Sequence, residues 1–163
     1  MEWREYRYEQ KDFKTNYKSH LSKNIIIYLV GILLMGILNL VISKITNQTL
    51  SGNEEKIREY IKSFPIYMIY SSVIFSPYIE ELIFRKSLKN IFKYKYVFII
   101  LSGIIFGLTH VSDPNSMTEL LYSIPYILMG IVFSVIYSRT NNIFTTITFH
   151  FCHNLILLII QFL

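Results

Sequence analysis

The chain has 163 residues, enough for about one domain; 52% of them are hydrophobic and only 17% are charged, which is low for a soluble domain. The single cysteine, Cys152, excludes an internal disulfide and is expected to be a small packing residue. The net charge of +5 suits contact with anionic membrane lipids, and because the basic residues flank apolar segments we expect no binding of nucleic acid.

Residues 1–24 predict a cytoplasmic tail, partly helical, and not a signal peptide. Glutamate and aspartate are mixed with lysine and arginine in this stretch, and no small-residue cleavage site precedes an apolar core. Aromatic residues such as Trp3, Tyr6 and Phe13 would rest at the level of the lipid headgroups, where such rings are enriched.

Five apolar segments follow, each close to the roughly 20 helical residues that cross a hydrocarbon core of about 30 Å. They cover residues 25–43, 64–84, 96–112, 120–138 and 143–163. No strand-like alternation or glycine-rich fingerprint competes with this pattern, and helices satisfy their own backbone polar groups in lipid. Residues 25–163 therefore predict an all-α, polytopic membrane helix bundle of about five transmembrane helices.

The distribution of lysine and arginine predicts the orientation of these spans. Basic residues are concentrated in the tail and in residues 85–95, whereas residues 113–118 contain none. We therefore expect a multi-pass protein of the bacterial plasma membrane with its N-terminus in the cytoplasm. The segment 45–61, predicted as an outer loop, fits this rule least well because it carries Lys56 and Arg58.

The second span ends in the sequence Glu80-Glu81-Leu-Ile-Phe-Arg85. Pro77 suits the first turn of a helix, so we expect a new helical segment to begin near it and its positive end to stabilise both carboxylates. The four-residue spacing predicts that Glu81 and Arg85 pair on one helix face, which leaves Glu80 free to polarise a water. The plainer alternative is two interfacial acids that end a membrane helix.

The third span contains Phe106-Gly-Leu-Thr-His110. Gly103 and Gly107 are four residues apart and predict a surface where another helix packs closely. His110 is either a functional residue or a histidine near a helix end that bonds to a neighbouring backbone group.

The fifth span carries polar residues at every fourth position: Asn142, Thr146, His150 and Asn154. Such stripes usually hold membrane helices together by hydrogen bonds. A second histidine, His153, lies beside the stripe. Two histidines and an amide within five residues are more than helix packing needs.

Together, these residues would suit hydrolysis of an amide bond inside the membrane, where ionisable side chains are rare unless they function. Glu80 and His110 would hold and deprotonate a water, while His150 and the Asn154 amide would donate to the oxyanion. Two other interpretations use the same side chains. Glu80, His110 and His150 would also suit zinc, although no His-Glu-x-x-His motif is present, and a proton or ion path is the third alternative.

The three motifs, in this order, resemble the CAAX protease and bacteriocin-processing family of intramembrane proteases, also called CPBP or Abi. The resemblance covers residues 76–154, about half of the chain. It implies an intramembrane CAAX-type endopeptidase, either glutamate-dependent or a metalloendopeptidase, so no cofactor is strictly required and zinc would be an option. It also implies Glu80 and His110 as the water-activating pair, His150 and Asn154 as oxyanion stabilisers, and Glu81 and Arg85 as structural or orienting residues.

The resemblance further implies a peptide or lipid-anchored protein as substrate, with roles in peptide processing, bacteriocin immunity or surface-protein display. A non-catalytic bacteriocin self-immunity protein is the main alternative function. Five spans are fewer than many relatives have, so an enclosed cavity could depend on an oligomer. Straight helices would also keep Glu80 and His110 apart. We therefore expect either a helix break at Pro77, with residues 86–95 lying along the membrane interface, or a third span that starts later than residue 96. In both cases we expect the side chains of Glu80, His110, His150 and Asn154 to share one cavity.

Overall fold

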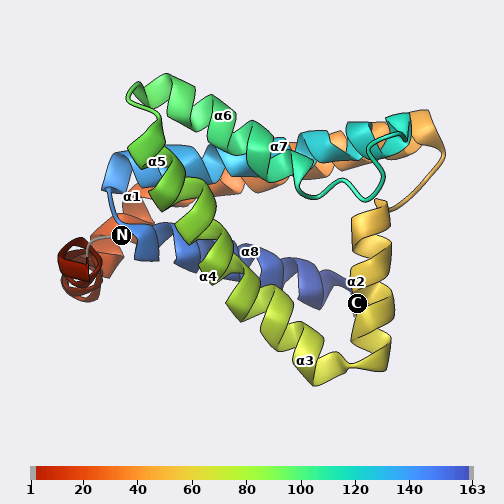
Figure 1. Ribbon diagram of the computed structural model, residues 1–163. Helices are drawn as coiled ribbons and strands as arrows, with labels where there is room; N and C mark the ends of the chain where they lie inside the picture. Colours follow the sequence, from red (N-terminus) through yellow and green to blue (C-terminus); the bar gives the residue numbers. More distant parts are fainter. Residues whose placement is uncertain (1–2, 162–163) are drawn as a thin grey trace.

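The computed structural model describes residues 3–161, and its regular structure in that range is entirely helical (Figure 1). The helices in chain order are α1 (Trp3–Thr46), α2 (Gly52–Ser63), α3 (Pro65–Ile69), η1 (Tyr70–Phe75), α4 (Ser76–Glu81), η2 (Leu82–Ser87), α5 (Leu88–Ile91), α6 (Lys95–Leu108), α7 (Met117–Thr140) and α8 (Ile143–Gln161). The predicted all-α membrane bundle is confirmed.

The helices correspond closely to the predicted spans. α1, α7 and α8 are each long and apolar enough to cross a membrane, and α6 is a shorter apolar helix. The predicted second span lies in the segment from α3 to α5, which we call the composite helix. Residues 1 and 2 of the predicted tail and residues 162 and 163 of the predicted fifth span lie outside the described residues.

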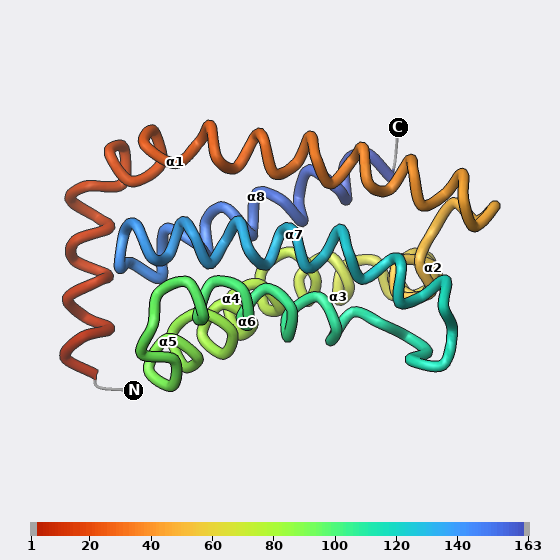
Figure 2. Tube along the Cα trace, turned by 90° about the horizontal axis from the view of Figure 1, so that it is seen from above, coloured from red at the N-terminus to blue at the C-terminus, as the bar shows by residue number. Residues whose placement is uncertain are grey.

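α7 forms the centre of the bundle and packs against α1, α6 and α8 (Figure 2). Its buried side chains Met129, Phe133 and Ile136 meet Tyr28 of α1 and Phe149 of α8 in the main apolar core.

The predicted close-packing surface of α6 faces α7. A Cβ atom on Gly103 would lie 2.9 Å from the backbone nitrogen of Ile131, and one on Gly107 would lie 2.6 Å from that of Ile127. Only glycine permits such an approach, so these two residues set the distance between the helices.

The composite helix does not break at Pro77, so the predicted new helix start is wrong. The helix passes through Pro77 because π-helical turns, η1 and η2, lie on either side of α4 (Figure 1). In η1 the N–H of Ser76 bonds to the carbonyl of Ser71, five residues back. This wider turn accommodates the proline without ending the helix. Glu80 and Glu81 therefore have no free helix N-terminus beside them.

The composite helix also brings Glu80 and His110 to similar depths. It continues to Ile91, so Glu80 lies eleven residues, or about 16 Å, from its C-terminal end. His110 lies fifteen residues, or about 22 Å, beyond the start of α6 at Lys95. The proposed later start of the third span is therefore wrong. Residues 86–91 continue the composite helix, and their course along the membrane interface remains a prediction.

The predicted tail is helical and docks onto the bundle. Figure 2 shows the first part of α1 turned sharply away from the remainder, and the side-chain amide of Asn24 bonds to the His20 carbonyl one turn earlier, a pattern that bends helices. Glu9 is only 3% exposed; it accepts hydrogen bonds from Lys86 at 2.5 Å and from the first N–H of α8, on Ile143, at 2.7 Å. These bonds join the tail, the end of the composite helix and the α7–α8 turn at one end of the bundle.

A second polar contact holds the same segment. Asp12 accepts from Asn142 at 2.7 Å and contacts His20 at 2.8 Å. Its pKa is lowered below the ordinary value, first by a hydrogen bond from Asn16 and then by those from Asn142 and His20. The carboxylate form of Asp12 therefore stabilises the docked tail.

Part of the predicted loop 45–61 is the helix α2, which lies at the other end of the bundle. Its N-cap is Ser51, whose hydroxyl accepts from the N–H of Glu54. Glu119 of α7 accepts from the N–H of Gly52 at 2.8 Å and from that of Ser112 at 3.3 Å. A single carboxylate thus ties α2 to the loop that follows His110.

Candidate active site

The four predicted catalytic side chains line one cavity of about 550 Å³. Glu80 comes from α4, His110 from the turn after α6, and His150 and Asn154 from α8, while α1, α2 and α7 provide the remaining walls. The prediction that these side chains share a cavity is confirmed, and the helices of one chain are sufficient to form it. Their catalytic roles remain predictions.

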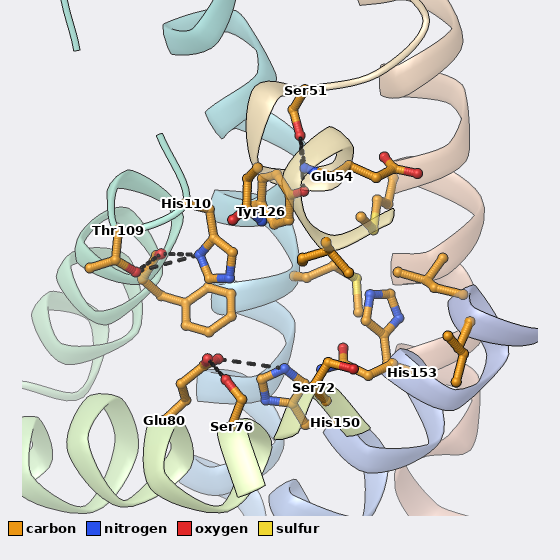
Figure 3. A pocket seen from close by; sticks show the side chains of 18 of the residues that line it. Ser51, Glu54, Ser72, Ser76, Glu80, Thr109, His110, Tyr126, His150 and His153 are labelled. Carbon is orange, nitrogen blue, oxygen red and sulfur yellow. Dashed lines mark hydrogen bonds and ion pairs between the residues drawn. The ribbon is translucent and has the colours of Figure 1, made fainter. Parts of the chain in front are cut away.

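Glu80 lies at the surface of this cavity with its side chain 22% exposed. The hydroxyl of Ser76, one turn earlier on the composite helix, donates a hydrogen bond to its carboxylate. The Nε2 atom of His150 lies 3.8 Å from the other oxygen (Figure 3). The carboxylate is therefore oriented by two neighbours and still open to a water.

Glu81 and Arg85 form a buried ion pair behind the cavity, as the four-residue spacing predicted. Arg85 Nε lies 3.1 Å from Glu81 Oε2, and both side chains are 0% exposed. The other oxygen of Glu81 accepts from His150 Nδ1 at 2.9 Å, while Arg85 donates to Ser102 of α6 at 2.7 Å. Glu81 thus fixes the ring orientation of His150 and leaves its Nε2 atom directed at the cavity.

His110 faces Glu80 across the cavity (Figure 3). Its Nδ1 atom lies 2.9 Å from the carbonyl of Phe106, so Nδ1 carries the proton of the neutral ring and Nε2 has the free lone pair. The ring stacks on Tyr126 of α7 with a centroid distance of 4.5 Å and an interplanar angle of 16°. His110 is therefore held by two elements while Nε2 can accept a proton.

Asn154 and His153 occupy the part of the cavity farther along α8. The Nδ2 atom of Asn154 donates to the backbone carbonyl of Ser72 at 2.8 Å. His153 is 5% exposed and packs edge-on against Phe133, and in the described part of the chain its Nδ1 atom has no hydrogen-bond partner.

The predicted zinc ligands do not form a ligand set in residues 3–161, where no three His, Cys, Asp or Glu side chains come close enough together to hold a metal ion. The Glu80 and His150 atoms are 3.8 Å apart, close to the spacing of two ligands on one tetrahedral zinc ion, and the bond from His150 Nδ1 to Glu81 leaves Nε2 free, but in the described part of the chain no third donor joins them. Zinc at Glu80, His110 and His150 remains a prediction.

Residues 62–156 match the family model described as type II CAAX prenyl endopeptidase Rce1-like. The match covers more than half of the chain and contains every predicted site residue. The chain belongs to this family.

Similar proteins include the Bacillus subtilis (strain 168) protein named "Putative membrane peptidase YdiL", with 32% identity over 68% of this chain and 43% of the relative. The "Membrane-embedded CAAX protease MroQ" of Staphylococcus aureus (strain USA300) is 30% identical over 83% of this chain and 57% of the relative. The "UPF0177 protein YvdC" of Lactococcus lactis subsp. lactis (strain IL1403) is 27% identical over 90% and 56%. The chain thus spans about half the length of these relatives. No solved structure matches it.

For this Rce1-like protein, sequence reasoning missed two serines of the site. Ser72 and Ser76 line the cavity on the same helix face as Glu80, and Ser76 bonds to it directly. The four-residue spacing of Ser72, Ser76 and Glu80 was a usable signal, because it forms a second polar stripe opposite that of α8. The contribution of Ser102 to the Arg85 ion pair had no comparable signal.

Proposed function

We propose that this protein is an intramembrane endopeptidase that hydrolyses a peptide bond in a small peptide or a lipid-anchored precursor. The observation that carries the proposal is the convergence of Glu80, His110 and His150 on one cavity walled by apolar helices. Membership of an endopeptidase family supports it, as does the similarity to MroQ, which is named a membrane-embedded CAAX protease.

In the proposed reaction, a water binds between Glu80 and the Nε2 atom of His110. Glu80 takes a proton from this water as its oxygen attacks the carbonyl carbon of the substrate. The C–N bond of the resulting tetrahedral intermediate then breaks, and Glu80 returns the proton to the departing amine. The water thus contributes one hydrogen to the amine and the hydroxyl to the new carboxylic acid.

His150 supplies the oxyanion donor in this scheme. Its Nδ1–H is bonded to Glu81, so the ring can donate from Nε2 only when it carries both protons. Glu81 at 2.9 Å and Glu80 at 3.8 Å are the charges that stabilise this imidazolium, and Arg85 balances Glu81. A donor already aimed at the developing charge needs little reorganisation during the reaction.

The glutamate-dependent mechanism is the one that these contacts support. Among residues 3–161, no third His, Cys, Asp or Glu side chain joins Glu80 and His150 closely enough to complete a zinc ligand set. We therefore expect a strong zinc chelator to leave the cleavage rate of the purified protein unchanged. A metal-dependent enzyme would lose activity with the chelator and regain it when zinc is added back.

The decisive experiment compares Glu80→Gln with the unmodified protein, purified and returned to lipid vesicles. The probe is a defined library of internally quenched fluorescent peptides, with products identified by mass spectrometry. Gln keeps the shape of the side chain but cannot accept a proton, so we expect cleavage to fall by about 10²- to 10⁴-fold. Glu59→Gln, on the exposed face of α2, is the matched control and should cleave normally.

Unchanged cleavage by Glu80→Gln would reject the proposed catalytic role. Absence of cleavage in the unmodified protein, together with immunity that tolerates loss of Glu80, would favour a non-catalytic membrane protein.

A further inference from the structure

One backbone carbonyl of the composite helix, that of Ser72, lacks a hydrogen-bond donor from the helix itself. The N–H of Ser76 bonds to Ser71 in the π-helical register. In the same register the next donor would be residue 77 and the next acceptor the carbonyl of Ser72, but Pro77 has no N–H. The Ser72 carbonyl is therefore left without a donor from its own helix.

The side chain of Asn154 fills this gap. Its Nδ2 atom donates to the Ser72 carbonyl at 2.8 Å, across the interface between α8 and the composite helix. A carbonyl can only accept, so this contact also fixes which end of the amide faces the helix. The contact is partly buried, and a carbonyl left without a donor is unfavourable wherever lipid or packed side chains keep water away.

We propose that Asn154 is a positioning residue: its amide replaces the N–H that Pro77 lacks and thereby holds the helical turn carrying Glu80 in place against α8. This inference rests on the proposed function and adds to the predicted oxyanion role of Asn154, because the bond to Ser72 uses only one of the two N–H groups of the amide.

The geometry explains how a contact at Ser72 acts on Glu80. Ser72, Ser76 and Glu80 lie at four-residue intervals and all line the cavity, with Ser76 bonded to Glu80. On α8, Asn154 lies four residues after His150, which approaches Glu80 at 3.8 Å. The two α8 side chains therefore hold the composite helix at two points, and two points fix its rotation about its own axis.

The contact with Ser72 is compatible with donation to the oxyanion. It uses one of the two N–H groups of the Asn154 amide, and Asn154 lines the same cavity as Glu80 and His150.

A double-mutant cycle with Pro77 tests the inference. Pro77→Ala restores an N–H that can bond to Ser72, so the positioning part of the Asn154 effect should disappear in that background. With the quenched-peptide library, we expect Asn154→Ala to lower kcat/KM about tenfold more in the otherwise unmodified protein than beside Pro77→Ala, where the remaining loss measures donation to the oxyanion. His150→Ala is the matched control, and its loss should be the same in both backgrounds.

A loss for Asn154→Ala that is equal in both backgrounds would overturn the inference and leave Asn154 with the oxyanion role alone. If Asn154→Ala does not fold, recovery of a folded protein in the double variant would support the inference, and failure of both would overturn it. Two further measurements separate positioning from general destabilisation. The kcat–pH profile of folded Asn154→Ala enzyme should change shape and return in the double variant, whereas a merely smaller folded fraction would leave its shape unchanged.

Hydrogen exchange gives a result that does not depend on activity. Amides of residues 76–81 should exchange faster in Asn154→Ala than in the unmodified protein, and return to the original rate beside Pro77→Ala. Unaltered exchange in Asn154→Ala would contradict the inference even if the peptides are not substrates. Failure of the proposed function would instead appear as normal cleavage by Glu80→Gln.

Discussion

The buried Glu81–Arg85 ion pair gives the sharpest stability prediction. Replacing Arg85 by Met keeps much of the side-chain volume but leaves His150 as the one polar partner of the Glu81 side chain among residues 3–161. Both members of the pair are 0% exposed, so water cannot solvate the charge that remains. Breaking a buried pair from one side typically costs about 3–5 kcal/mol, and we expect Arg85→Met to lower the free energy of unfolding by that amount.

The double variant Arg85→Met with Glu81→Gln should recover part of this loss, because it removes the uncompensated charge as well as the pair. The free energy of unfolding can be measured by titrating sodium dodecyl sulfate into mixed micelles and following helix content by circular dichroism. Cleavage should stay low in both variants, because His150 loses its orienting carboxylate–guanidinium pair.

A second ion pair in the same chain provides the control. Arg58 and Glu54 on α2 have the same four-residue spacing and a distance of 2.8 Å, but their side chains are 40% and 34% exposed. Solvent screens such a pair, so Arg58→Met should cost no more than about 1 kcal/mol. Equal effects for Arg85→Met and Arg58→Met would refute the argument that burial makes the Glu81–Arg85 pair critical.

Two further predictions follow from the packing of α6 and the docking of the tail. Gly107→Ala places a methyl group 2.6 Å from the Ile127 backbone nitrogen and should cost about 1–3 kcal/mol and slow cleavage, whereas Gly36→Ala, with nothing within 4 Å, should not destabilise the protein. Because the pKa of Asp12 is lowered by folding, its contribution to stability is complete above the ordinary value of 3.8 and is lost as the pH falls through the lower folded value. The protection of amides 3–20 from hydrogen exchange, relative to the unfolded chain at the same pH, should therefore fall below about pH 3.8 in the unmodified protein, and Asp12→Asn should remove most of that change; protection that does not vary with pH would contradict this.

Hydropathy was sufficient to find the membrane helices, because long uncharged runs have few alternative structures. It failed where local chemistry decides the outcome. Helix α2 was hidden in a charged segment, although Ser51-Gly-Asn-Glu54 has the spacing of a helix-capping box. The continuity through Pro77 depends on π-helical turns, which have no reliable sequence signature.

The candidate site was predictable as a set of residues and much less as a set of contacts. Motif spacing was enough to pair Glu81 with Arg85, since residues four apart share a helix face. The partner of Asn154 could not be predicted, because the unpaired carbonyl of Ser72 exists only in the π-helical register. The role of Glu9 was missed for a related reason: its partners lie far away in the sequence.

The hydrogen bond between Glu9 and Ile143 joins residues 134 positions apart. A ribosome therefore makes the acid long before the helix that it caps. Until α8 emerges, neither the cap nor the α8 side of the cavity can form, so the nascent protein holds Glu80 without His150. The order of synthesis alone would therefore keep a chain that lacks α8 inactive, and the hydrogen bonds of Glu9 at the α7–α8 turn would form only after α8 has emerged.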